Sequence, residues 1–179
     1  MSAEPTAKRL AAEEPFADWP KDAASSADER TTLMAFLDYY RAVLARKATG
    51  ITEEQSRLAA CPPSDMTILG LVRHMAEVEN NWFRFWLDGD GPTTRWEGEE
   101  DFAVDGADVE DAFDYWRQEC GNARAVLARF TSLDDVGAGQ TVGAGISVRW
   151  TLVHMIEEYA RHNGHADFLR EAIDGTTGD

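Results

Sequence analysis

The chain has 179 residues, 44% of them hydrophobic and six of them tryptophan, so it is long enough to bury the core of one globular domain. Its formal net charge of −16, from 33 acidic and 17 basic residues, argues against nucleic acid and anionic membrane surfaces as partners. Both of those partners attract clustered lysine and arginine. The sequence holds no apolar run as long as a signal peptide or a membrane span, so we expect a cytoplasmic protein.

The first 27 residues are rich in Ala, Glu, Pro, Ser and Asp. This composition predicts an irregular N-terminal arm over 1–27, with Trp19 as the residue that would attach it to the body of the protein. Residues 28–179 are expected to form the single folded domain. Its cysteines, Cys61 and Cys120, have no CxxC spacing, so both are predicted to be ordinary buried or partly buried thiols.

The folded domain contains segments in which apolar residues recur with the period of a helix. The four predicted helices run from about Asp28 to Gly50, Ile68 to Leu87, Asp108 to Phe130 and Val148 to Ile173. Asp28 and Ser147 have side chains suited to capping the first and the last of them. Long glycine-containing loops, 88–107 and 134–145, join the later helices, and the first of these is long enough to suggest a functional role. No segment alternates as a strand does, so the chain predicts an all-α four-helix bundle.

The histidines of the chain occur in only two of these helices. His74 lies alone in the second, while His154, His162 and His165 lie together in the fourth. Glu158 and His162 are four residues apart, and their helical phase places them within or beside the stripe that faces the core. A buried carboxylate without a partner is costly in free energy, and a metal ion or a histidine pair would offset that cost.

A histidine from another helix would complete a His/Glu/His set with Glu158 and His162. Three protein ligands that leave coordination positions open are typical of catalytic metal sites. Each residue also has an ordinary interpretation. His74 alone could be a hydrogen-bonded core histidine, and Glu158 with His162 could be a simple pair on one helix face. His154 and His165 are better suited to lining such a site than to binding the metal directly.

Two further features of the helices bear on the site. Glu79 falls inside the apolar arc of the second helix, so it needs a partner. The second nitrogen of a ligating histidine is one candidate, although a structural role is the simpler interpretation. An aromatic set is interpreted as core more readily than as a substrate box. It consists of Trp82, Phe85, Trp86 and Trp116.

Two segments resemble a known family in the order and spacing of their residues: Leu71 to Glu79, and Val148 to Asp167. They are similar to the DinB-like superfamily, most closely its DUF664 branch, over about residues 28–178. The resemblance implies a four-helix bundle with a divalent metal, usually zinc or nickel, held by one residue of the second helix and two of the fourth. Carried over to this chain, the metal ligands are His74, Glu158 and His162.

At the position of Glu158, the family more often has histidine. The related mycothiol-dependent maleylpyruvate isomerases resemble this chain in having glutamate there. A His₂Glu set accepts zinc, nickel, iron or manganese, and zinc is the expected metal. The characterised relatives use mycothiol or bacillithiol, so the resemblance implies a metal-dependent S-transferase or isomerase. Such an enzyme would take a small thiol, with mycothiol as the candidate, and an electrophilic substrate.

In that enzyme His165 or His154 would move a proton. The alternatives are a metal-dependent hydrolase, in which the metal activates water, and a non-catalytic module that binds a metal or a small ligand. A hydrogen-bond network without metal is the structural alternative. A homodimer is the expected assembly, since two-fold dimers are the commonest oligomers.

Overall fold

The structure is a computed structural model that describes residues 8–10, 25–90, 94–98, 100–139 and 145–177. Its main helices are α1 (Glu29–Ala48), α3 (Ile68–Glu79), α4 (Val109–Leu127) and α5 (Val148–Asp174). The described residues form no strand, only two isolated β-bridges. The all-α four-helix bundle predicted from the sequence is therefore confirmed. Trp19, the expected attachment point of the arm, lies outside the described residues.

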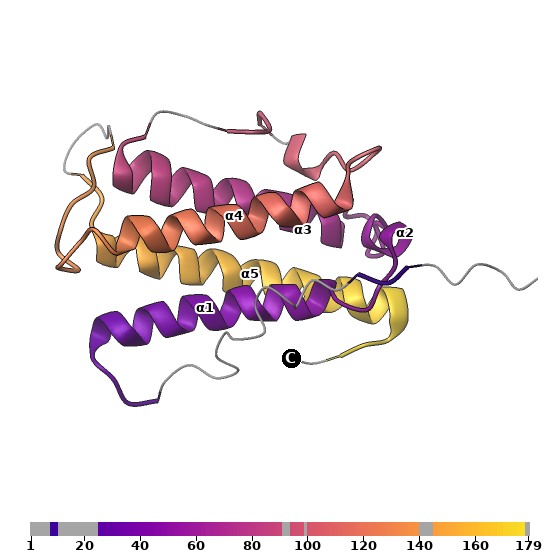
Figure 1. The fold of residues 1–179 in the computed structure, drawn as a ribbon. Coiled ribbons are helices and arrows are strands. Elements are labelled where there is room, and N and C mark those ends of the chain that lie inside the picture. The colour runs from indigo at the N-terminus through magenta and orange to yellow at the C-terminus, as the bar shows by residue number, and fades with distance from the viewer. Residues whose placement is uncertain (1–7, 11–24, 91–93, 99, 140–144, 178–179) are drawn as a thin grey trace, which may run out of the picture.

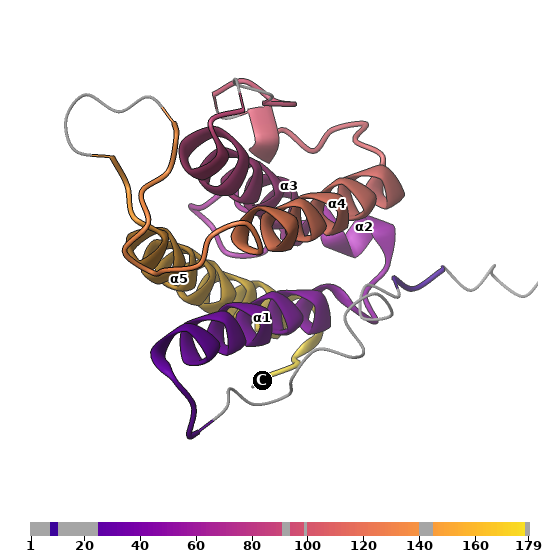
Figure 2. The same ribbon diagram turned by 60° about the vertical axis from the view of Figure 1, so that its left-hand side comes forward.

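The four helices are arranged as two packed pairs. In Figures 1 and 2, α1 lies along α5 and α3 lies along α4, and these are also the two most extensive helix contacts. Helix α5 contacts α3 as well, so the two pairs close around a common core. The largest completely buried apolar side chains of this core are Leu37, Leu44, Ile51, Ile68, Leu69, Leu71, Met75, Phe83, Leu87, Trp116 and Tyr159.

The main helices begin at side-chain caps. Asp28 accepts a hydrogen bond from the Thr31 backbone N–H, and Ser147 accepts one from the Trp150 N–H, as the sequence predicts for α1 and α5. The predicted ends are a few residues too long in two cases. Helix α1 ends at Ala48 and α4 at Leu127. The prediction was less accurate at these ends because the C-terminal turns are less sharply marked in the sequence than the N-terminal caps.

The second predicted helix changes its winding halfway along. After Glu79 the α-helix α3 continues as the π-helix η2, Asn80–Asp88, which ends at Gly89 in the left-handed conformation (φ 81°). The sequence predicted one continuous α-helix here. A π-helix closes its hydrogen bonds one residue later than an α-helix, so the side chains of η2 point in different directions from those of a continued α-helix.

Short elements in the connections were not predicted. They are the single turn α2 (Glu53–Ser56) and the 3₁₀ turn η3 (Glu100–Phe102) inside the 88–107 loop. From the N-terminal arm, Leu10 pairs with Ile51 through its backbone and packs against the core. The boundary between arm and domain stays a prediction.

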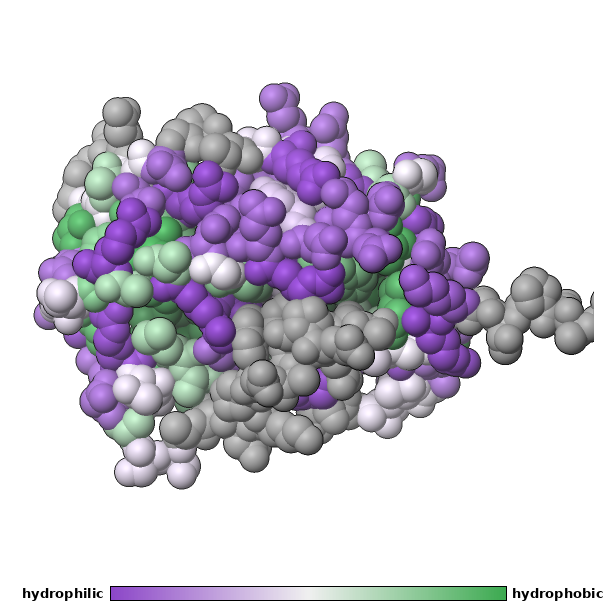
Figure 3. Space-filling model, in the orientation of Figure 1, coloured by the Kyte–Doolittle hydropathy of each residue, from purple (hydrophilic) through white to green (hydrophobic). Residues whose placement is uncertain are grey.

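The face in Figure 3 is largely hydrophilic, and its hydrophobic side chains form small separate patches. Within the described part of the chain, no helix is both long enough and apolar enough to cross a membrane.

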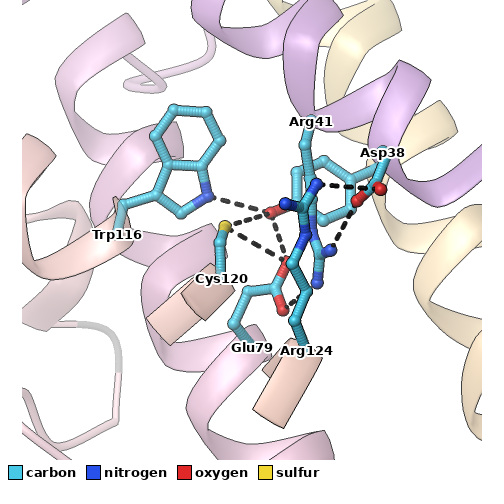
Figure 4. A network of polar contacts seen from close by, with 7 residues as sticks. Asp38, Arg41, Glu79, Trp116, Cys120 and Arg124 are labelled. Atoms are coloured by element: carbon cyan, nitrogen blue, oxygen red, sulfur yellow. Dashed lines mark hydrogen bonds and ion pairs between the residues drawn. The ribbon is translucent and has the colours of Figure 1, made fainter. Parts of the chain in front are cut away.

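A buried polar network joins the four helices (Figure 4). The carboxylate of Glu79, completely buried on α3, accepts hydrogen bonds from Arg41 Nε and Nη2 of α1 at 2.7 and 2.6 Å. The Tyr159 hydroxyl of α5 donates to the same carboxylate at 2.7 Å and accepts from Trp116 Nε1 of α4 at 2.8 Å. Glu79 is therefore paired with Arg41 and Tyr159, and the suggested contact with a ligating histidine is wrong.

Candidate metal centre

The three predicted metal ligands come together where α3 faces α5. One ligand atom from each of His74, Glu158 and His162 lies within 4.8 Å of the others, and we call these residues the His/Glu/His group. Glu158 Oε2 is 3.5 Å from His162 Nε2, and the His74 and His162 rings are 4.7 Å apart between centroids. The helical phase of α5 therefore directs Glu158 and His162 toward His74, as the sequence predicts. That these residues bind metal stays a prediction.

The orientation of His74 is fixed by the segment that follows η2. Asp101 Oδ2 lies 2.7 Å from His74 Nδ1, and the Phe102 ring stacks on the imidazole at 4.9 Å. Asp101 is itself buried. With Nδ1 bonded to a carboxylate, the Nε2 atom of His74 is the one left to bind a metal, which is the usual arrangement of a metal-binding histidine.

Asp101 is a residue of the site that the sequence analysis missed. The only available signal was the length of the 88–107 loop, which suggested a function without pointing to a residue. The described part of this loop is fixed to α3 through buried side chains. Glu77 Oε1 accepts hydrogen bonds from the backbone N–H groups of Arg95 and Trp96 at 2.8 and 3.1 Å. Arg73 Nη2 donates to the Glu100 carbonyl at 2.9 Å.

His162 is held in a comparable way by its own helix. Its Nδ1 lies 3.3 Å from His165 Nδ1, which leaves Nε2 toward Glu158. Burial, together with the nearby His74 and His165, lowers the pKa of His162 from 6.5 to about 4. His162 is consequently neutral at pH 7, which is the form in which histidine binds metal ions.

His154 lies on the other side of Glu158. Its Nε2 is 3.3 Å from Glu158 Oε1, although the two atoms are not aligned for a hydrogen bond. The ring stacks on Trp150, with centroids 4.9 Å apart and planes inclined by 14°, and it meets Trp82 edge-on at 4.3 Å. Both predicted proton-transfer residues thus adjoin a member of the His/Glu/His group: His154 adjoins Glu158 and His165 adjoins His162.

The predicted aromatic core separates into two parts. Trp116 is completely buried, as expected. By contrast, Trp82, Phe85 and Trp86 of η2 are only half-buried, so the prediction that they belong to the core holds only in part.

The donor set fits a divalent metal ion. Two imidazole nitrogens and one carboxylate oxygen converge, and each histidine has its Nδ1 turned to another side chain. Such a set is compatible with zinc, nickel, iron or manganese, and three ligands leave positions for a substrate atom. The arrangement can therefore hold an ion with open coordination.

Comparison with known protein families gives a match over most of the chain. The family model described as MST, mycothiol-S-transferase, matches residues 32–175, which include most of α1, all of α3, α4 and α5, and the whole His/Glu/His group. No curated protein matches the chain.

Proposed function

The chain belongs to the mycothiol-S-transferase family, a DinB-like family, and on this premise we propose that it is a divalent-metal-dependent thiol transferase. Its substrates would be a small thiol, with mycothiol as the candidate, and an electrophile. Membership of the family confirms the resemblance to the DinB-like superfamily. The observation that carries the proposal is the convergence of His74, Glu158 and His162 on one point between α3 and α5.

In the proposed enzyme, His74 Nε2, a Glu158 carboxylate oxygen and His162 Nε2 would hold the metal, with zinc as the expected ion. The bound ion supplies a positive charge that favours the thiolate form of a thiol, which is the nucleophilic form. Asp101 keeps the His74 ring oriented through Nδ1, and His165 does the same for His162. The site therefore needs little rearrangement to bind a metal ion.

The transfer forms one carbon–sulfur bond and breaks one bond to the leaving group. The thiol loses its proton, its sulfur attacks the electrophilic carbon, and the leaving group departs with the bonding electron pair. We assign the thiol proton to His154, whose Nε2 lies 3.3 Å from Glu158 Oε1 and has no hydrogen-bond partner among the described residues. His165 uses its Nδ1 to orient His162, so it is the second candidate and would take the proton only when that contact is broken.

The test begins with the metal content of the purified protein, measured by elemental analysis. We expect stoichiometric metal in the wild type and its loss in Glu158→Ala and His162→Ala. Glu171→Ala removes an exposed carboxylate elsewhere on α5 and should retain the metal. Metal that remains absent after reconstitution of the wild type would overturn the proposal.

The second part of the test is the reaction itself. Conjugation of mycothiol with chlorodinitrobenzene or monochlorobimane should require the metal and disappear in the two ligand variants. The spectrum of Co(II)-substituted protein should also change when thiol is added. A metal-loaded protein whose Co(II) spectrum does not change when thiol is added would instead be a non-catalytic module. Turnover of a hydrolysable substrate without any thiol conjugation would indicate a hydrolase.

A further inference from the structure

Next to the His/Glu/His group lies a cluster of aromatic side chains, of which the proposed chemistry uses only His154. We call Trp82 and Trp86 of η2, together with Trp150 and His154 of α5, the aromatic platform. The rings of Trp82 and Trp150 are 5.1 Å apart between centroids, and those of Trp82 and Trp86 are 6.4 Å apart. Trp150 is 47% exposed, so this indole remains largely accessible to solvent.

The platform is continuous with the candidate metal centre along one ridge of α5. Trp150, His154, Glu158 and His162 follow one another at intervals of four residues, so they lie along the same side of the helix. With a rise of about 1.5 Å per residue, His154 is about 6 Å and Trp150 about 12 Å along the helix axis from Glu158. A small molecule that reacts at the metal centre can therefore reach the platform.

The winding of η2 provides an independent indication. π-Helical turns are rare, and they occur frequently at functional sites. In η2 this winding buries Phe83 and Leu87 and leaves Trp82 and Trp86 half-buried. Accessible apolar side chains gathered beside a polar centre are typical of a ligand site, because leaving them in water is unfavourable.

We propose that the aromatic platform binds the electrophile, and that this substrate carries a planar aromatic or conjugated group within about 6–12 Å of its reacting carbon. Flat indole and imidazole rings stack well on planar groups and gain less from small aliphatic ones. Trp150 stacks nearly parallel on His154, whose Nε2 lies 3.3 Å from Glu158 Oε1, so the platform directly adjoins the His/Glu/His group. This inference rests on the proposed function, of which it specifies the substrate class.

The first experiment measures binding without turnover. The unreactive planar probe 2,4-dinitroaniline is titrated into the purified protein by calorimetry. Trp150→Ala should weaken its binding by about 3- to 10-fold, and Trp150→Phe should restore most of the affinity. Phe168→Ala, which removes a 69% exposed aromatic side chain elsewhere on α5, serves as the matched control and should bind as the wild type does. Equal binding to the wild type and Trp150→Ala would overturn the proposal.

The second experiment compares two electrophiles with mycothiol as the common thiol. Trp150→Ala should lower kcat/KM for chlorodinitrobenzene by about 3- to 10-fold and leave that for iodoacetamide unchanged. A raised KM for mycothiol with no change toward either electrophile would place the thiol on the platform and overturn the proposal. The proposal would also be overturned if the wild type is a dimer, Trp150→Ala is a monomer, and both bind the probe equally well. The platform would then be a subunit interface.

The two parts of the argument can fail separately. If the wild type binds 2,4-dinitroaniline through Trp150 but conjugates no thiol, the platform stands and the proposed transferase function falls. If it conjugates mycothiol to chlorodinitrobenzene and iodoacetamide equally well in wild type and Trp150→Ala, the function stands and the substrate class is wrong.

Discussion

Asp101 Oδ2 lies 2.7 Å from Nδ1 of His74, so a loop carboxylate and a helix histidine form one unit at the candidate metal centre. The two residues are far apart in sequence, and they meet because Arg73 and Glu77 hold the loop against α3. Phe102, next to Asp101, stacks on one face of the imidazole ring. The contact between Asp101 and His74 fixes both the position of the His74 ring and the nitrogen, Nε2, that the ring offers to a metal ion.

Asp101→Asn should therefore weaken metal binding without abolishing it. The variant removes the negative charge that orients the His74 ring, and changes of this kind typically cost about 10- to 100-fold in metal affinity. Competition with a chromophoric chelator measures the effect. Asp105→Asn changes an exposed carboxylate of the same loop and should leave the affinity unchanged. Equal affinities in the two variants would show that Asp101 does not position His74.

The lowered pKa of His162 predicts how the stability of the metal-free protein depends on pH. The unfolded chain binds a proton at this residue below about pH 6.5, whereas the folded chain binds it only near pH 4. Protonation consequently favours the unfolded state, and the free energy of unfolding should fall as the pH is lowered from 6.5 to 4.

Replacement of His162 by glutamine removes this contribution. Urea denaturation at pH 7.5 and pH 5 should show a smaller loss of stability in His162→Gln than in the wild type. The comparison between the two proteins cancels the contributions of the other titrating groups. An identical pH dependence in both would mean that His162 is protonated equally well in the folded protein.

Breaking the buried network should be far more damaging than breaking an ion pair at the surface. Glu79→Ala leaves the Arg41 guanidinium buried without its main partner, and such a loss costs about 3–5 kcal/mol. Asp114→Asn breaks an exposed pair with Arg117 on α4 and should cost about 0–1 kcal/mol. Denaturant titration measures both values. A small effect of Glu79→Ala would show that water enters to solvate Arg41.

The sequence predicts the part of the site that depends on helical periodicity. Glu158 and His162 are inward-facing because their phase is set by the apolar residues of α5, and the structure brings both to His74. Asp101 could not be located in this way, since a loop has no period and its path depends on hydrogen bonds to Arg73 and Glu77.

The sequence does not predict the partner of Glu79 or the π-helical winding of η2, for a related reason. A buried carboxylate signals that it needs a partner, but Arg41 becomes that partner only when α1 packs beside α3. The shift from α-helix to π-helix begins at Asn80 and places Phe83 and Leu87 in the core formed with the other helices. The hydrophobic periodicity of a single segment therefore predicts neither the partner of Glu79 nor the change of winding.

The change of winding after Glu79 also separates two parts of the site. His74 lies before it and the indoles of Trp82 and Trp86 lie after it, on what is otherwise a single helix. A return of η2 to α-helical winding would redirect the side chains of Trp82 and Trp86 while leaving His74 in place. A change confined to η2 would in this way alter the aromatic platform and leave the His/Glu/His group unchanged.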